Sequence, residues 1–207
     1  MSAESGLEFG NTADKGHVIT ADCPGMEENM GNVILIGFMG CGKSTVGLRL
    51  SYRLRRTIID TDKEIEKEEN RSISEIFAAD GEAYFRDRET AILRKLKESA
   101  NNQIISVGGG LPVRKENRAL LHELGQVFYL RAEGGTIYER VKDDTRRPLL
   151  QVDDPLKKIE TLIRERDPYY TEAADVVITV DGKSFSQILD EIEAQVNERE
   201  ITISAEG

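Results

Sequence analysis

The sequence predicts an α/β fold in which helices cover both faces of a five-stranded parallel sheet, giving three α/β/α layers. Short apolar runs typical of strands alternate with helical patterns along the chain, and this alternation is typical of mostly parallel sheets. Right-handed crossovers are expected between successive strands. The five apolar runs cover residues 33–36, 57–59, 103–107, 127–130 and 175–180.

Helical spacing of apolar residues fills the intervals between these runs. The helix predicted after the first run has Val46, Leu50 and Leu54 on one face. The segment 143–155 interrupts the pattern because it is charged and contains two prolines, and we expect a mobile loop there. The predicted helices cover residues 43–54, 61–69, 72–79, 82–98, 114–123, 136–141, 155–166 and 184–196.

Composition restricts the classes of partner. Hydrophobic residues make up 39% of the 207 positions, as in globular proteins, and no run is long enough to span a membrane. The net charge of -10 argues against a nucleic-acid or membrane-surface partner. Cys23 and Cys41 do not form a disulfide framework and no signal peptide is visible, so we expect a cytoplasmic protein.

The chain divides into three segments. Residues 1–30 are polar and lack periodicity, so we expect a disordered N-terminal extension. Residues 31–197 carry all the predicted strands and helices and form one domain, which we expect to be a monomer. Residues 198–207 are expected to form a polar C-terminal tail.

The segment 37–45, GFMGCGKST, matches the phosphate-binding pattern G-x-x-x-x-G-K-[ST] between a strand and a helix. Glycines allow the backbone to curl so that its N–H groups face a phosphate, and the following helix adds its positive end. Lys43 can reach the β- and γ-phosphates of ATP, and the Ser44 hydroxyl can bind Mg²⁺. The pattern predicts a P-loop NTPase fold. The expected ATP contacts in this segment are Gly40, Cys41, Gly42, Lys43, Ser44 and Thr45.

Two acids, Asp60 and Asp62, directly follow the second predicted strand. Ligands of open α/β sheets gather at the carboxyl ends of strands, so an acid here can hold water around Mg²⁺ or accept a hydrogen bond from an acceptor hydroxyl. The alternative is that Thr61 or Asp62 only caps the next helix. The position after a P-loop helix favours a functional role, and we expect Asp60 and Ser44 to serve the metal.

Further motifs follow in an order that resembles the shikimate kinases, which are small P-loop enzymes of the nucleoside-monophosphate-kinase type. The resemblance covers residues 32 to about 196, nearly the whole predicted domain. It is carried by GFMGCGKSTVG at 37–47, DTD at 60–62, GEAYFR at 81–86, VGGG at 107–110, RPLL at 147–150 and RDPYY at 166–170.

The resemblance implies an enzyme that transfers the γ-phosphoryl group of ATP to the 3-hydroxyl of shikimate with Mg²⁺ as cofactor, a step of chorismate and aromatic amino-acid biosynthesis. It implies that Arg86 and Arg166 bind the substrate carboxylate, which suits the planar guanidinium fork. Asp62 would orient the hydroxyl and could take its proton. The implied substrate contacts of the glycine triplet are Gly109 above all, with Gly108 and Gly110.

The resemblance also implies a lid at about 143–155, in which Arg147 contacts the ATP phosphates. Arg140, just before this lid, would stack on adenine. With Lys43 and Asp62, Arg147 completes the expected catalytic residues. The residues alone also allow purely structural interpretations. Arg86 could be a solvated helix charge paired with a nearby glutamate, the glycine triplet could be a flexible turn, and Arg147 could be a solvated loop residue.

Two rival functions stay open at this point. One keeps the chemistry and changes the acceptor, as in gluconate kinases and other P-loop metabolite kinases; Arg86, the glycine triplet and Arg166 favour shikimate. The other is a non-catalytic ATP-binding regulator on the same fold. Every expected catalytic position is occupied, which favours an enzyme.

Overall fold

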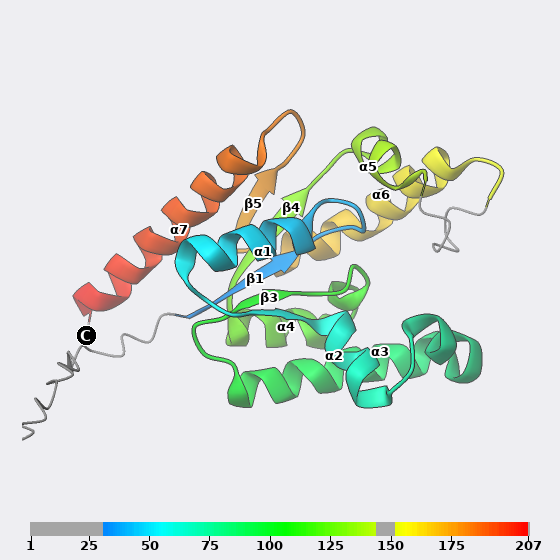
Figure 1. The fold of residues 1–207 in the computed structure, drawn as a ribbon, viewed down its shortest axis with the longest axis horizontal. Helices are drawn as coiled ribbons and strands as arrows, with labels where there is room; N and C mark the ends of the chain where they lie inside the picture. Colours follow the sequence, from blue (N-terminus) through cyan, green and yellow to red (C-terminus); the bar gives the residue numbers. More distant parts are fainter. Residues whose placement is uncertain (1–30, 144–151, 207) are drawn as a thin grey trace, which may run out of the picture.

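Five strands form the centre of the structure, and their order across the sheet is β2-β3-β1-β4-β5 (Figure 1). The computed structural model describes residues 31–143 and 152–206. Within them every strand pairing is parallel, as the sequence predicts. The strands are β1 (Asn32–Ile36), β2 (Ile58–Asp60), β3 (Ile104–Ser106), β4 (Gly125–Arg131) and β5 (Val176–Thr179).

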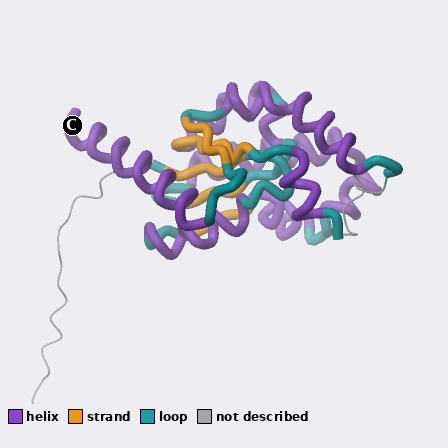
Figure 2. Tube along the Cα trace, turned by 90° about the horizontal axis from the view of Figure 1, so that it is seen from above, coloured by secondary structure: helices purple, strands orange, loops and turns teal. Residues whose placement is uncertain are grey.

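Helices cover both faces of this sheet, so the predicted three-layer arrangement is confirmed (Figures 1 and 2). One layer holds α1 and α7, which contact each other. The other holds α3, α4 and α6, in which α4 contacts both α3 and α6 and packs on β4. The bounds of these helices are α1 (Lys43–Leu54), α3 (Ile73–Ser99), α4 (Lys115–Leu124), α6 (Pro155–Ala173) and α7 (Phe185–Glu206).

The strand register brings the carboxyl ends of three neighbouring strands to one level. Asp60, the last residue of β2, pairs with Ser106 of β3, which in turn pairs with Leu35 of β1. The segments that leave this edge therefore start side by side, although they are far apart in the sequence. They are α2 (Thr61–Glu69) after β2, the glycine triplet and the short helix η1 (Leu111–Val113) after β3, and the phosphate-binding segment after β1.

The break predicted between helices 72–79 and 82–98 is confirmed at Gly81. The structure has one element, α3, but Gly81 has non-helical backbone angles of φ 80° and ψ 177°. This region of backbone space is essentially restricted to glycine. The first part of α3 begins at a capping box in which Ser72 and Glu75 satisfy each other's N–H groups.

Two predicted helix ends are wrong. Helix α6 continues through Pro168 to Ala173 rather than ending at residue 166. Proline removes one helical N–H donor, but Tyr170 and Ala173 beyond it are fully buried, and this packing keeps the segment helical. Helix α7 continues to Glu206 rather than ending at residue 196, so the predicted polar tail is helical up to that residue.

The remaining helix, α5 (Gly134–Val141), follows β4 and contacts α6. Residues 1–30, for which we predict disorder, lie outside the described part of the chain, as do residues 144–151 of the predicted lid. Among the described residues, no helix is both long enough and apolar enough to cross a membrane.

Candidate active site

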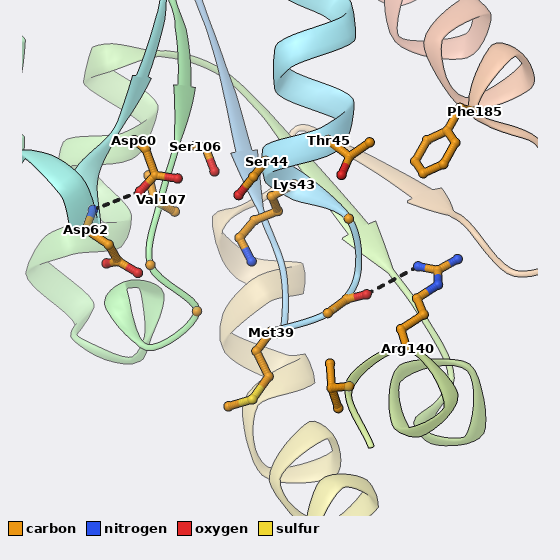
Figure 3. Close-up of a pocket in the computed structure, with 15 residues that line it drawn as sticks. Met39, Lys43, Ser44, Thr45, Asp60, Asp62, Ser106, Val107, Arg140 and Phe185 are labelled. Atoms are coloured by element: carbon orange, nitrogen blue, oxygen red, sulfur yellow. Dashed lines mark hydrogen bonds between the residues drawn. The ribbon is translucent and has the colours of Figure 1, made fainter. Parts of the chain in front are cut away.

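A cleft of about 400 Å³ opens at the carboxyl edge of the sheet (Figure 3). Its walls come from the phosphate-binding segment, the ends of β2 and β3, the end of α5 and the start of α7. In Figure 3, Lys43 and Ser44 lie between Asp60 and Asp62 on one side and Arg140 and Phe185 on the other. The lining residues are Met39, Gly40, Gly42, Lys43, Ser44, Thr45, Asp60, Asp62, Ser106, Val107, Gly108, Gly109, Arg140, Val141 and Phe185.

The phosphate-binding segment has the curled backbone that its glycines predict. Gly42, which precedes α1, has φ 110°, and Gly40 has φ 76°, both in the region that L side chains rarely adopt. A Cβ at Gly40 would also lie 2.6 Å from Val141 Cγ1. The Lys43 ammonium donates hydrogen bonds to the carbonyl oxygens of Gly37 and Phe38, at 2.8 and 3.1 Å. These bonds keep Lys43 at the loop, where it lines the cleft.

The sequence left open whether the acids after β2 cap the next helix or serve the site, and the structure gives one role to each of Asp60 and Asp62. Asp60, rather than Thr61 or Asp62, caps α2: its Oδ1 accepts hydrogen bonds from the N–H groups of Asp62 and Lys63. Asp62 lines the cleft, and its Oδ1 is buried without a hydrogen-bond partner among the described residues. Burial, reinforced by the like charge of Asp60, raises the pKa of Asp62 to about 6.

Arg86 belongs to a buried charge cluster beside the glycine triplet. Its guanidinium pairs with Glu89 at 2.8 Å and with Glu82 at 2.7 Å, and a Cβ at Gly110 would collide with it. The proposed pairing with a nearby glutamate is therefore present, but the Arg86 side chain is only 15% exposed and is not a solvated helix charge. Arg86 lies close enough to Asp62 to lower the pKa of that carboxyl group against the effect of burial.

Glu89 is the most deeply buried acid of this cluster, with a side chain 1% exposed. Burial raises its pKa to about 7, although the ion pair with Arg86 opposes the shift. The carboxylate of Asp62 adds like charge in the same direction. A Cβ at Gly108 would collide with Asp62 and would lie 3.0 Å from Glu89 Oε1. Glycine at position 108 thus allows both acids to approach the backbone.

The glycine triplet is a fixed loop rather than a flexible turn. The N–H of Gly108 donates to Thr61 Oγ1 at 3.0 Å, and the carbonyl oxygens of Gly108 and Gly110 accept from the N–H groups of Leu111 and Val113. The Gly109 carbonyl accepts from the Tyr170 hydroxyl at 2.5 Å. Gly108 and Gly109 line the cleft, whereas Gly110 lies against Arg86 instead.

Of the three remaining arginines that the sequence predicts as ligand contacts, two lie in the described part of the chain, and they differ in their position relative to the cleft. Arg140 lines the cleft and donates to the Gly40 and Cys41 carbonyl oxygens. Arg166 lies over the Phe38 ring, 5.7 Å from its centroid, and its charge acts on the Tyr170 hydroxyl, but it does not line the cleft. Arg147 lies outside the described residues.

Comparison with known proteins identifies the family. The family model described as "Shikimate kinase" matches residues 39–197 of this chain. The chain belongs to the shikimate kinase family.

Individual relatives agree with this assignment. The shikimate kinase of Chromobacterium violaceum is 43% identical over 155 residues, which cover 75% of this chain and 84% of that protein. The shikimate kinase of Symbiobacterium thermophilum is 41% identical over 170 residues, covering 81% of this chain and 97% of that protein. This chain therefore spans nearly the full length of these shikimate kinases.

Solved structures place the fold in the same family. The shikimate kinase of Acinetobacter baumannii in complex with shikimate superposes with a TM-score of 0.77 at 35% identity, covering 83% of this chain and 96% of that one. A gluconokinase from Sinorhizobium meliloti superposes with a TM-score of 0.53 at 16% identity, covering 86% of this chain and 98% of that one, and shows a common fold alone.

Three residues of this shikimate kinase site did not stand out in the sequence. Phe185 lines the cleft and packs under Arg49, whose guanidinium lies 4.4 Å from the ring centroid. Tyr170 is fully buried and bonds to Gly109. Glu89 had one usable signal, its position three residues after Arg86 on a helix, which permits an ion pair. Tyr170 had only its place as the last residue of the RDPYY motif, and Phe185 had only its place at the start of a predicted helix.

Proposed function

We propose that this chain transfers the γ-phosphoryl group of ATP to the 3-hydroxyl of shikimate, giving shikimate 3-phosphate and ADP. The observation that carries the proposal is the meeting of two kinds of group at one cleft. The phosphate-binding residues Lys43 and Ser44 line it together with Asp62 and Gly109. Arg86 adjoins it beside Gly110.

The nucleotide end of the cleft suits ATP. Backbone N–H groups of the curled loop and the N-terminus of α1 favour the negatively charged phosphates. Lys43, already at the loop, would move its ammonium from the loop carbonyls to the β- and γ-phosphates. Arg140 and Phe185 line the same cleft beyond Thr45, and their flat groups suit an adenine ring.

Mg²⁺ fits the donors that the cleft contains. Ser44 and Asp60 line it, and no group of three or more His, Cys, Asp or Glu side chains suited to a metal occurs among the described residues. Mg²⁺ usually takes few protein ligands and fills the rest with water and substrate phosphates. We propose that Ser44 and Asp60 hold it, Asp60 through water; when bound, it neutralises charge on the phosphate oxygens.

The acceptor end suits a small hydroxylated carboxylate. Arg86 and Arg166 offer two guanidinium groups near the Tyr170 hydroxyl, since the charges of both act on it. Either group can grip a carboxylate through two parallel hydrogen bonds. Asp62, inside the cleft, would then accept a hydrogen bond from the 3-hydroxyl of shikimate, and the N–H of Gly109 would contact the substrate.

The transfer follows from this placement. The 3-hydroxyl oxygen forms a bond to the γ-phosphorus as the bond from that phosphorus to the β–γ bridging oxygen breaks, and ADP leaves with the electron pair. The hydroxyl proton passes to Asp62. In a loose transition state this proton leaves late, so Asp62 orients the hydroxyl before it acts as a base. Lys43 stabilises the charge on the transferring group. The predicted role of Arg147 rests on the sequence resemblance.

Measurement of ADP release with MgATP, in parallel reactions with shikimate, with gluconate and with neither, tests the proposal. We expect turnover that depends on shikimate. Turnover with gluconate alone would replace the acceptor, and ATP binding without acceptor-dependent ADP release would indicate a regulator. Cytoplasmic location and a monomeric state are expected but are separate from this test.

Lysine substitutions test the proposed binding of the substrate carboxylate by Arg86 and Arg166, which we call the carboxylate clamp. Arg86→Lys and Arg166→Lys keep the charge and remove the fork, so each should raise the KM for shikimate by about tenfold while the KM for ATP stays within about twofold. Arg88→Lys is the matched control, because Arg88 lies on the same helix and pairs with Glu68 and Glu69 instead. Normal shikimate KM in both clamp variants would refute the assignment.

A further inference from the structure

A single buried side chain, Tyr170, binds the backbone at the centre of the glycine triplet. Tyr170 is 0% exposed, and its hydroxyl donates a hydrogen bond of 2.5 Å to the carbonyl oxygen of Gly109. A Cβ at Gly109 would lie 3.4 Å from the Gly37 carbonyl oxygen and from the Met39 nitrogen, so Gly109 also packs backbone to backbone against that loop. Two contacts, one with Tyr170 and one with the loop backbone, therefore fix the position of Gly109.

The hydroxyl fixes an orientation as well as a position. The carbonyl of Gly109 and the N–H of Gly110 belong to one planar trans peptide unit and point in opposite directions. With glycine on both sides, no Cβ restricts the rotation of this peptide unit. A hydrogen bond to its carbonyl oxygen therefore determines where the N–H of Gly110 points. None of the described residues accepts a hydrogen bond from the N–H of Gly109 or Gly110, which leaves both donors for a ligand.

The same hydroxyl also lies within electrostatic reach of the second guanidinium group, that of Arg166. Tyr170 and Arg166 lie four residues apart on α6, so their side chains share one face of the helix. The positive charges of Arg166 and, more weakly, Arg86 act on the Tyr170 hydroxyl and oppose the rise in its pKa that burial causes. This arrangement exists because α6 continues through Pro168. The hydroxyl thus lies where the glycine triplet and both arginines meet.

We propose that Tyr170 is a positioning residue, whose hydroxyl holds the Gly109–Gly110 peptide, beside the Arg166 guanidinium, in the arrangement that receives the acceptor substrate. The inference rests on the proposed function, because it concerns the shikimate end of the same cleft. It does not involve the nucleotide end. A phenylalanine has nearly the same size and would fill the space, but without the hydroxyl it would leave the peptide free to turn.

Tyr170→Phe tests this role in the full chain. Without the hydroxyl the Gly109–Gly110 peptide can turn away from the substrate, so we expect the KM for shikimate to rise about tenfold, which corresponds to about 1.4 kcal/mol of binding free energy. The KM for ATP and kcat at saturating shikimate should stay within about twofold, because the nucleotide contacts are unchanged. A merely structural role would lower the melting temperature and would not separate the two substrates.

Tyr129→Phe is the matched control. Tyr129 is 1% exposed, and its ring packs on Tyr170 at 5.0 Å between centroids. Its hydroxyl donates to Asp167 at 2.9 Å rather than to the glycine triplet. We expect a comparable loss of stability and an unchanged shikimate KM. An unchanged shikimate KM in Tyr170→Phe, or an equal rise in both variants, would overturn the proposal.

The wild-type protein separates failure of this inference from failure of the proposed function. Absence of shikimate turnover in the wild type would refute the function, whereas wild-type turnover with a normal KM in Tyr170→Phe would refute the positioning role alone. If Tyr170→Phe does not fold, wild-type protein labelled with ¹⁵N-glycine provides the test. The amide signal of Gly110 should shift when shikimate is added, and an unmoved signal would overturn the proposal.

Discussion

Replacement of Glu89 by glutamine should change how the stability of this protein depends on pH. Glu89 is buried against Arg86 with a pKa of about 7, compared with about 4.3 in an unfolded chain. Between these values the folded protein holds a proton that the unfolded chain has lost, so the free energy of unfolding falls as pH rises and becomes level above pH 7. Glutamine cannot ionise, and this contribution disappears.

The magnitude follows from the shift. At 1.36 kcal/mol per pKa unit, and with the folded and unfolded forms differing by one proton over about two pH units, the wild type should lose about 2.5 kcal/mol more than Glu89→Gln between pH 5 and pH 8. Urea unfolding at the two pH values measures this difference. Some slope remains in the variant, because the pKa of Asp62 is also raised, to about 6.

Glu82→Gln is the control for this experiment. Glu82 pairs with the same arginine, but its side chain is 66% exposed, so its replacement should change stability by less than about 1 kcal/mol. If Glu89→Gln and the wild type lose stability in parallel from pH 5 to pH 8, then Glu89 ionises as an ordinary acid in the folded protein. The description of the site as a desolvated charge cluster would then be wrong.

Three further predictions concern turnover. Lys43→Ala should lower kcat by about 10²–10³-fold, since charge stabilisation is a large catalytic contribution; a smaller than fivefold loss in the ADP-release assay would contradict this. Gly108→Ala would push a Cβ into Asp62 and within 3.0 Å of Glu89 Oε1, so the KM for shikimate should rise while ATP affinity, measured by calorimetry, is retained. Because burial raises the pKa of Asp62 to about 6 and the ionised form is needed, kcat/KM for shikimate should fall as pH drops below about 6. An acid limb that persists in Asp62→Asn would assign it to another group.

Local sequence predicted much of the fold because its signals act between near neighbours. The bounds of α1 (Lys43–Leu54) and α2 (Thr61–Glu69) agree to the residue, and the break at Gly81 was anticipated. The phosphate-binding loop could also be predicted from local sequence, because its glycines are required by the backbone angles of the loop itself. The end of α6 was not, because the packing of Tyr170 outweighs the local effect of Pro168.

In the candidate site, too, some features could be predicted from local sequence and others could not. The residue types and their order, including both clamp arginines, the acids after β2 and the glycine triplet, were determined by the sequence itself. Only the tertiary structure decided that Asp60 caps a helix while Asp62 faces the cleft, that Glu89 becomes a buried acid, and that Tyr170 reaches a glycine 61 residues away. These outcomes depend on burial and on contacts between distant segments. A residue's neighbours in sequence carry no information about which distant side chains will exclude water from it.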